Sequence, residues 1–251
     1  GPANVISQGT QEMYRAQVGY PIGYFYGLKT NGIFQNDAEV QAYKNSSGGL
    51  IEPSAVPGDV RYVDTNKDGL ISQDDATMIG NPNPKYTYGL SLSAEYKGLD
   101  FSLIATGVQG VDIMKSYRSF YDSWQQNYTT DIFGRWHGEG TSNRIPRLVA
   151  GPSINTQYVS DLYVENGSYL RISNVTLGYD FKKLIKKMPM AQFRLYVAVQ
   201  NLYTFTKYSG MDPAVGFIPV QADGTAGYSS NIDVGFYPNP RTVMMGASIK
   251  F

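Results

Sequence analysis

The chain has 251 residues with 21 basic and 21 acidic side chains, so its net charge is zero, and it contains no cysteine. The balanced charge argues against a nucleic-acid binder, which would carry a basic excess. The missing cysteines exclude disulfides, thiolate metal sites and a cysteine nucleophile. No apolar run is long enough for a transmembrane helix, and we expect no signal peptide at the start. Tyrosine and glycine are abundant, which favours β structure with many turns.

The first 63 residues are the least regular part of the chain. The run YPIGYFYGLKTNGIF (20–34) predicts one or two short strands. Residues 36–45 place apolar side chains at helical spacing after Asp37, which predicts a short helix. The segment 46–59 is rich in turn-forming residues and is interpreted as a linker.

Residues 64–75, DTNKDGLISQDD, have the spacing of a twelve-residue calcium-binding loop. Ca²⁺ takes about six to eight oxygen ligands, and such a loop supplies them from positions 1, 3, 5, 7, 9 and 12. At these positions stand Asp64, Asn66, Asp68, the backbone carbonyl of Leu70, Ser72 (directly or through water) and Asp75. Gly69 permits the sharp turn, and Ile71 is expected to anchor the loop by packing.

The alternative for this segment is a loop of Asx turns that holds no metal. Aspartate at position 12, in place of glutamate, resembles the dockerin variant of the loop more than the helix-flanked one. No long amphipathic helices flank the segment, as a calcium sensor would need. We therefore expect any bound calcium to be a structural cofactor.

From residue 76 onward the chain alternates apolar and polar residues with period two, which is the signal of half-buried strands. Five strands of about ten residues are predicted, at 86–96, 99–108, 169–181, 192–203 and 242–251. Only Lys97 and Gly98 separate the first two, which predicts a tight hairpin. Short and long links then alternate, as in outer-membrane barrels with short periplasmic turns and long extracellular loops.

The short link 182–191 carries four lysines, for which we expect a structural or lipid-headgroup contact. They are Lys182, Lys183, Lys186 and Lys187.

A soluble, calcium-stabilised β-sandwich, such as a carbohydrate-binding or adhesin module, also alternates and is the competing interpretation. Two features favour the membrane barrel. The faces opposite the apolar ones are small or polar, as a wet lumen requires, and tyrosines gather near strand ends, where barrels carry aromatic girdles. Five strands cannot close a barrel, for which about eight are the practical minimum. The sequence therefore predicts an all-β fold: an antiparallel segment of a larger transmembrane barrel, or one completed by further strands of the N-terminal third.

The long link 116–148 contains the candidate ligand-contacting residues, because aromatic rings stack on sugars and guanidinium groups pair with acids. They are Tyr117, Arg118, Tyr121, Trp124 and Arg135. The alternative is that these side chains pack the loop itself or face a partner protein. His137 is the single histidine of the chain, which is too few for a catalytic triad or a histidine-based zinc site. We expect no enzyme, and a calcium-dependent surface hydrolase has little support.

Four stretches, 19–36, 57–103, 164–181 and 237–251, together resemble the C-terminal portion of SusC/RagA-family TonB-dependent outer-membrane transporters of the Bacteroidetes type. The most specific parts are the Asp-rich loop, GNPNPKYTYG and the terminal RTVMMGASIKF. The resemblance implies a 22-stranded barrel with an N-terminal plug. It further implies a SusD-like surface lipoprotein as a lid, contact with TonB through a missing N-terminal part, and oligosaccharide or peptide cargo.

Under this interpretation the chain is expected to be a C-terminal fragment located in the bacterial outer membrane, in contact with its lipid. Residues 1–63 would form an extracellular loop region with short strands, 64–75 a calcium-loop-like insert, and 76–251 the barrel strands and extracellular loops. The identity of the cargo stays open.

Overall fold

The computed structural model describes residues 5–8, 13–115, 130–149, 153–215, 230–233 and 235–251. The chain divides into two compact units. The first comprises Gly1–Asn83, Asp112–Glu165 and Val215–Gly235, and the second Pro84–Val111, Asn166–Ala214 and Phe236–Phe251. The predicted all-β class is confirmed, since α1 (Asp37–Ala42) is the one α-helix of the described residues. Among these residues, no helix has the length and apolar character needed to span a membrane.

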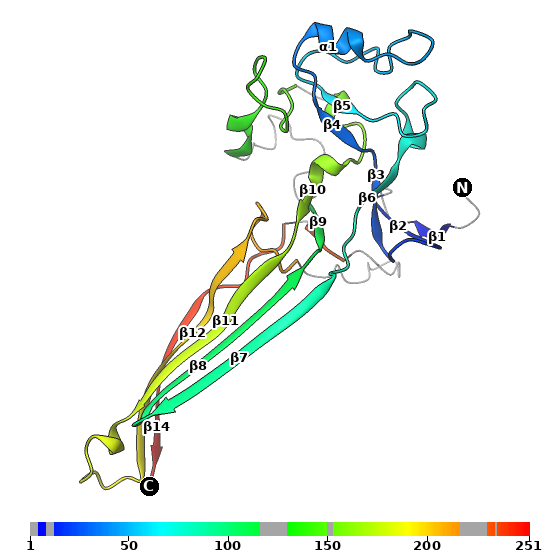
Figure 1. Ribbon diagram of the computed structural model, residues 1–251. Helices are drawn as coiled ribbons and strands as arrows, with labels where there is room; N and C mark the ends of the chain where they lie inside the picture. The colour runs from blue at the N-terminus through cyan, green and yellow to red at the C-terminus, as the bar shows by residue number, and fades with distance from the viewer. Residues whose placement is uncertain (1–4, 9–12, 116–129, 150–152, 216–229, 234) are drawn as a thin grey trace. The chain divides into compact units, whose positions relative to one another are not determined.

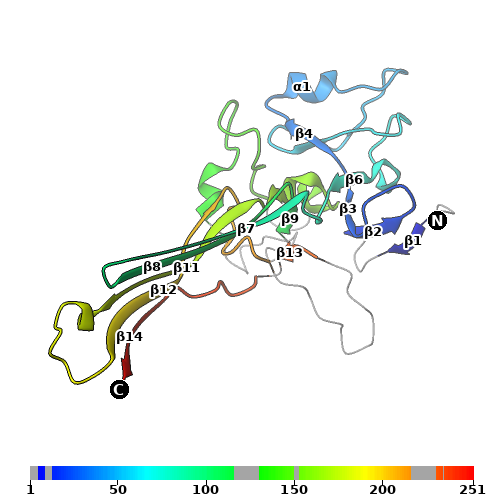
Figure 2. The ribbon, with the colours of Figure 1, turned by 60° about the horizontal axis from the view of Figure 1, so that its bottom comes forward.

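The second unit is a single antiparallel sheet of five long strands in the order β14-β12-β11-β8-β7, which run side by side in Figure 1. The strands are β7 (Tyr86–Tyr96), β8 (Leu99–Gln109), β11 (Tyr169–Asp180), β12 (Gln192–Thr206) and β14 (Thr242–Lys250). All five correspond to strands predicted from period-two alternation. Each pairs with the strand that precedes or follows it in this set, so the sheet is a simple meander. In Figure 2, β12 and β14 curve away from the nearly straight hairpin of β7 and β8.

The turn between β7 and β8 confirms the predicted hairpin. Tyr96 pairs with Leu99, which leaves Lys97 and Gly98 as the two turn residues. Both have positive φ angles, 49° and 90°. A two-residue turn of type I′ needs positive φ at both positions, because only then does the turn match the twist of its strands. Gly98 meets this need without strain.

The first unit contains short strands in three small sheets. One sheet consists of β1 (Val5–Gln8), β2 (Tyr14–Gln17), β3 (Tyr24–Gly27) and β6 (Thr77–Gly80). A second pairs β4 (Thr30–Ile33) with β5 (Val60–Tyr62). In the third, β9 (Asp112–Lys115) lies between β10 (Val164–Asn166), at whose end the unit boundary falls, and β13 (Ile232–Asp233). Strands β3 and β4 lie in the run 20–34, where one or two short strands were predicted.

Helical segments in the first unit are short. Helix α1 follows Asn36, whose side-chain oxygen accepts a hydrogen bond from the Glu39 amide at 3.0 Å, and this confirms the predicted helix. The 3₁₀ turns are η2 (Gln73–Asp75), η3 (Thr130–Gly134), η4 (Ile154–Thr156) and η5 (Asp161–Tyr163). The core consists of small clusters, centred on Phe25 and Met114, on Leu28 and Tyr62, and on Phe34.

Candidate functional site

One face of the five-stranded sheet is apolar from edge to edge. Its side chains line up in rows across all five strands, set by the strand register. One row consists of Ala94, Phe101, Leu177, Val197 and Met245, and the next of Tyr96, Leu99, Tyr179, Leu195 and Ala247. A contiguous exposed apolar patch of this extent is unfavourable in water and marks contact with protein or lipid.

Exposure of this face contradicts the β-sandwich alternative. That interpretation requires the apolar side chains to meet across a closed core. Leu92 is 50% exposed, Leu177 51% and Val243 64%. Strand β7 is exposed at all of its residues, on both faces. The apolar face therefore belongs to no core formed by the described residues.

The opposite face is polar, and an ion pair crosses it. Asp100 on β8 accepts a hydrogen bond from Arg194 Nε on β12 at 2.7 Å, although β11 lies between these strands. Gly178 of β11 stands directly beside Asp100 in the register. A Cβ at this glycine would lie 2.5 Å from Asp100 Oδ1 and 2.6 Å from Arg194 Nη2, so the absent side chain leaves the room for the pair.

A second polar contact ties down the link between β12 and β14. Arg171 on β11 is buried, donates from Nε to Thr204 Oγ1 at 2.9 Å, and pairs with the Asp212 carboxylate. The same carboxylate accepts the backbone amides of Ala214 at 2.9 Å and Asn239 at 3.2 Å. Asp212 thus joins the two ends of this link to the sheet. The sequence pattern did not single it out, because its partners are distant along the chain.

The predicted calcium loop folds as a series of Asx turns. The two carboxylate oxygens of Asp64 accept the amides of Lys67 at 2.6 Å and Gly69 at 2.9 Å. Asn66 Oδ1 accepts the amide of Asp68 at 2.8 Å, and Asp68 Oδ1 accepts the amide of Leu70 at 2.9 Å. The loop is therefore wrapped around the oxygens that the calcium prediction uses.

Position 12 of the loop has a different environment. Asp75 is fully buried and accepts backbone amides from Thr65 at 2.8 Å, Asn66 at 3.2 Å and Ser72 at 2.9 Å. It also completes a capping box with Ser72 at the start of η2. These bonds occupy both of its oxygens, so Asp75 closes the loop whether or not an ion is present.

The chemistry of these donors fits calcium in part. A carboxylate or amide oxygen that accepts one hydrogen bond keeps a lone pair, so Asp64, Asn66 and Asp68 retain ligating capacity. Asp75 retains the least ligating capacity, because its two oxygens already accept three hydrogen bonds. In the described part of the chain, no group of three acidic or histidine side chains converges as a metal site. Calcium binding by residues 64–75 stays a prediction. Ile71 does pack against the cluster of Leu28, Val60 and Tyr62, as expected for the anchor of the loop.

Of the candidate ligand-contacting residues, Arg135 is the one that the structure describes. Its Nη1 donates to the Ile132 carbonyl at 3.0 Å, which is a contact within its own loop. Tyr117, Arg118, Tyr121 and Trp124 lie outside the described residues. Ligand contact by these residues stays a prediction.

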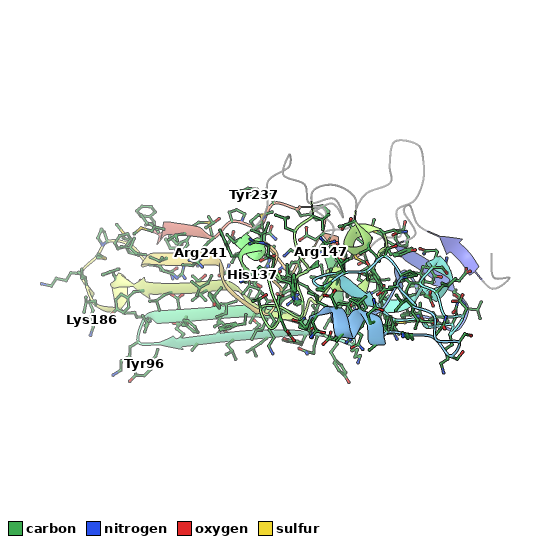
Figure 3. The ribbon with its side chains drawn as sticks, turned by 90° about the horizontal axis from the view of Figure 1, so that it is seen from above. Tyr96, His137, Arg147, Lys186, Tyr237 and Arg241 are labelled. Atoms are coloured by element: carbon green, nitrogen blue, oxygen red, sulfur yellow. The ribbon has the colours of Figure 1, made fainter. Side chains whose placement is uncertain are left out.

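The segment 130–149 is held by its own hydrogen bonds and by the loop before β5. His137 Nδ1 lies 3.0 Å from the Arg135 carbonyl, and its amide donates to Thr141 Oγ1 at 3.0 Å. Arg147, marked with His137 in Figure 3, pairs through Nε with buried Asp59 at 2.7 Å. Asp59 also accepts from Asn155 Nδ2 at 3.0 Å. Sequence reasoning missed this triad of Asp59, Arg147 and Asn155. Asp59 is 88 residues from Arg147 and 96 residues from Asn155 along the chain.

Glu52 is a further buried acid that the sequence did not reveal. It is 4% exposed, and its Oε1 accepts the Tyr62 amide at 3.3 Å. Its Oε2 has no hydrogen-bond partner among the described residues. The pKa of Glu52 is raised to about 8, chiefly by burial and in smaller part by the nearby Asp59, against the opposing effects of the Tyr62 amide and Arg61. This carboxyl is therefore largely protonated at neutral pH.

Known TonB-dependent receptors have sequences similar to this chain. The TonB-dependent receptor P3 of Formosa agariphila is 31% identical over 253 residues, which cover 100% of this chain and 24% of the receptor. The TonB-dependent receptor SusC of Bacteroides thetaiotaomicron is 29% identical over 227 residues, 86% of this chain and 21% of SusC. No protein-family model matches.

Solved structures show the same fold. A chain of the RagAB peptide importer in its "open-open" state superposes with a TM-score of 0.65 at 22% identity, covering 100% of this chain and 24% of that one. In the "closed-closed" state the TM-score is 0.66 at 24% identity, with 100% and 25% covered.

The sheet is thus a portion of an outer-membrane β-barrel of the TonB-dependent receptor class. The resemblance to the SusC/RagA family is confirmed, and so is the expected outer-membrane location. The chain spans about a quarter of the length of the relatives that it matches.

Proposed function

We propose that the whole protein is a TonB-dependent importer, and that this chain supplies a sector of its barrel wall with the attached extracellular loops. The observation that carries the proposal is the two-faced sheet: apolar rows that no core covers, and a polar face crossed by the Asp100–Arg194 pair. A barrel wall needs both faces, because one meets lipid and the other lines a wet interior.

A labelling experiment on β11 tests the wall. Leu177 lies on the apolar face and is 51% exposed, whereas its neighbour Thr176 lies on the polar face. Cysteine replaces each residue separately in the full-length protein, which is then spin-labelled in bilayers. We expect the spin label at 177 to be relaxed mainly by oxygen, which concentrates in lipid, and the label at 176 mainly by a water-soluble nickel chelate. If both labels are more accessible to the same reagent, the proposal is contradicted.

The proposed partners are those of the family: a SusD-like surface lipoprotein as a lid, TonB as the source of energy, and an oligosaccharide or peptide as cargo. The similarity to SusC and to the RagAB peptide importer supports them. We propose no catalytic role. Deletion of the gene should abolish growth on one class of polymer, and deletion of TonB should reproduce the defect. Uptake that survives the loss of TonB argues against an importer of this class.

We also infer the organisation of the chain, with 1–63 as an extracellular loop region, 64–75 as an ordered insert and 76–251 as barrel strands and loops. Calcium in the insert would be structural, held by Asp64, Asn66 and Asp68 with the Leu70 carbonyl and Ser72. Elemental analysis of full-length protein tests this idea. An Asp64→Ala, Asp68→Ala variant should lose the bound calcium, whereas the exposed Asp74→Ala should keep it. Equal calcium content in the native protein, the double variant and Asp74→Ala contradicts the calcium prediction.

A further inference from the structure

The link between β11 and β12, residues 181–191, is an ordered turn. It begins with η6 (Phe181–Lys183), and the amides of Leu184 and Ile185 donate to the Phe181 carbonyl at 3.1 and 2.8 Å. Lys182 Nζ donates to two backbone carbonyls of the turn, those of Lys186 at 3.0 Å and Met188 at 2.7 Å. The charge of Lys182 is therefore used inside the turn and holds its shape. We call residues 181–191 the basic turn.

The other three lysines of the basic turn, Lys183, Lys186 and Lys187, are exposed. Between them stand two aliphatic side chains that are also exposed, Leu184 by 67% and Ile185 by 46%. Aliphatic residues flanked by lysines suit a membrane surface, because the apolar groups enter the acyl boundary while the ammonium groups remain among the headgroups.

Aromatic rings stand at the same end of the sheet. Phe181 contacts Tyr179 and Phe193 with ring centroids 5.1 and 6.0 Å apart. Tyr96 is 69% exposed, and Figure 3 shows it at the same end as Lys186. Aromatic girdles mark the membrane–water interface of barrels. The basic turn follows β11 directly beyond this girdle, which is the level of the lipid headgroups.

The two short links, 97–98 and 181–191, lie at this end of the sheet, whereas the long links 110–168 and 207–241 leave from the other end. Short turns of outer-membrane barrels face the periplasm. The headgroups at this end are therefore those of the inner leaflet. Three free ammonium groups are complementary to lipid phosphates that carry net negative charge.

We propose that the basic turn binds the headgroups of anionic glycerophospholipids in the inner leaflet of the outer membrane, through Lys183, Lys186 and Lys187. The proposal rests on the membrane placement argued under the proposed function. Each lysine near such a surface strengthens binding about fivefold, so the three together are expected to contribute at least about tenfold after screening by salt.

The test uses full-length protein in detergent and measures phospholipid binding by native mass spectrometry. The probe is phosphatidylglycerol, and phosphatidylcholine with the same acyl chains is the neutral comparison. The variant carries Lys183→Gln, Lys186→Gln and Lys187→Gln together. A matched control removes three exposed lysines of the first unit, Lys29, Lys44 and Lys67, in the same way. Heat-modifiable migration on gels verifies that each barrel has folded.

We expect the basic-turn variant to bind phosphatidylglycerol at least about tenfold more weakly, while the control and the binding of phosphatidylcholine do not change. Unchanged phosphatidylglycerol affinity overturns the proposal. So does a basic-turn variant that loses binding to an acidic periplasmic protein but keeps its phosphatidylglycerol affinity. The labels at positions 176 and 177 report on the importer proposal separately. If they behave as a barrel wall predicts while lipid binding is unaffected, only the lipid site fails.

Discussion

Glu52→Gln removes a buried carboxyl while keeping its shape and its bond from the Tyr62 amide. The pKa of Glu52 is about 8 in the folded chain, against an ordinary value of 4.5. Because folding raises this pKa, the stabilising contribution is fully present below about pH 4.5 and is lost as pH rises through about 8. The free energy of unfolding therefore changes by at most about 5 kcal/mol across this pH range, since one pKa unit corresponds to about 1.4 kcal/mol.

Amide hydrogen exchange of β5 in the full-length protein measures this effect, with rates corrected for the intrinsic effect of pH. The free energy of opening at Val60–Tyr62 should fall from pH 5 to pH 8 in the native protein and stay nearly constant in Glu52→Gln. At pH 8 the variant should be the better protected of the two. Asp37→Asn, which removes an exposed carboxylate of α1, should follow the native profile. Parallel profiles for native protein and Glu52→Gln would refute the reasoning.

Three further substitutions test single contacts. Gly178→Ala should destabilise the barrel by about 1–3 kcal/mol in urea unfolding, because the added methyl collides with the ion pair, whereas Gly89→Ala, whose nearest atom is 3.9 Å away, should cost less. Asp212→Ala leaves the buried guanidinium of Arg171 without its carboxylate, and should cost about 3–5 kcal/mol and open the β12–β14 link to proteases. Gly69→Ala, at φ 90°, should weaken protection of residues 64–75 from exchange by about 1–2 kcal/mol; unaltered exchange there contradicts the strain argument.

The five strands of the sheet were predictable because their signal is local. Alternation between two faces repeats every two residues, so Leu90, Leu92 and their neighbours identify β7 without knowledge of its partner strands. The hairpin turn at Lys97 and Gly98 is likewise determined by two adjacent residues. The Asp-rich loop is also a local pattern, and its Asx turns form within twelve residues of each other.

Contacts between distant residues were beyond the sequence. Asp100 and Arg194 are 94 positions apart, and nothing local indicates that Gly178 makes room for them. Asp75 matched position 12 of a calcium loop by spacing, yet its burial and three amide bonds depend on how the loop packs. The alternating pattern left open how a five-stranded sheet is completed, and the resemblance to a family decided this in favour of a larger barrel.

The four lysines of the basic turn show what the sequence determined and what the tertiary structure decided. By itself the sequence determined that positive charge gathers in a short link at one end of the sheet, because that follows from composition and strand alternation. Only the tertiary structure decided that Lys182 turns inward to the carbonyls of Lys186 and Met188, while Lys183, Lys186 and Lys187 remain exposed. The physical reason is that an ammonium group is satisfied by whichever acceptors the folded backbone brings within about 3 Å, and residue spacing does not specify those acceptors.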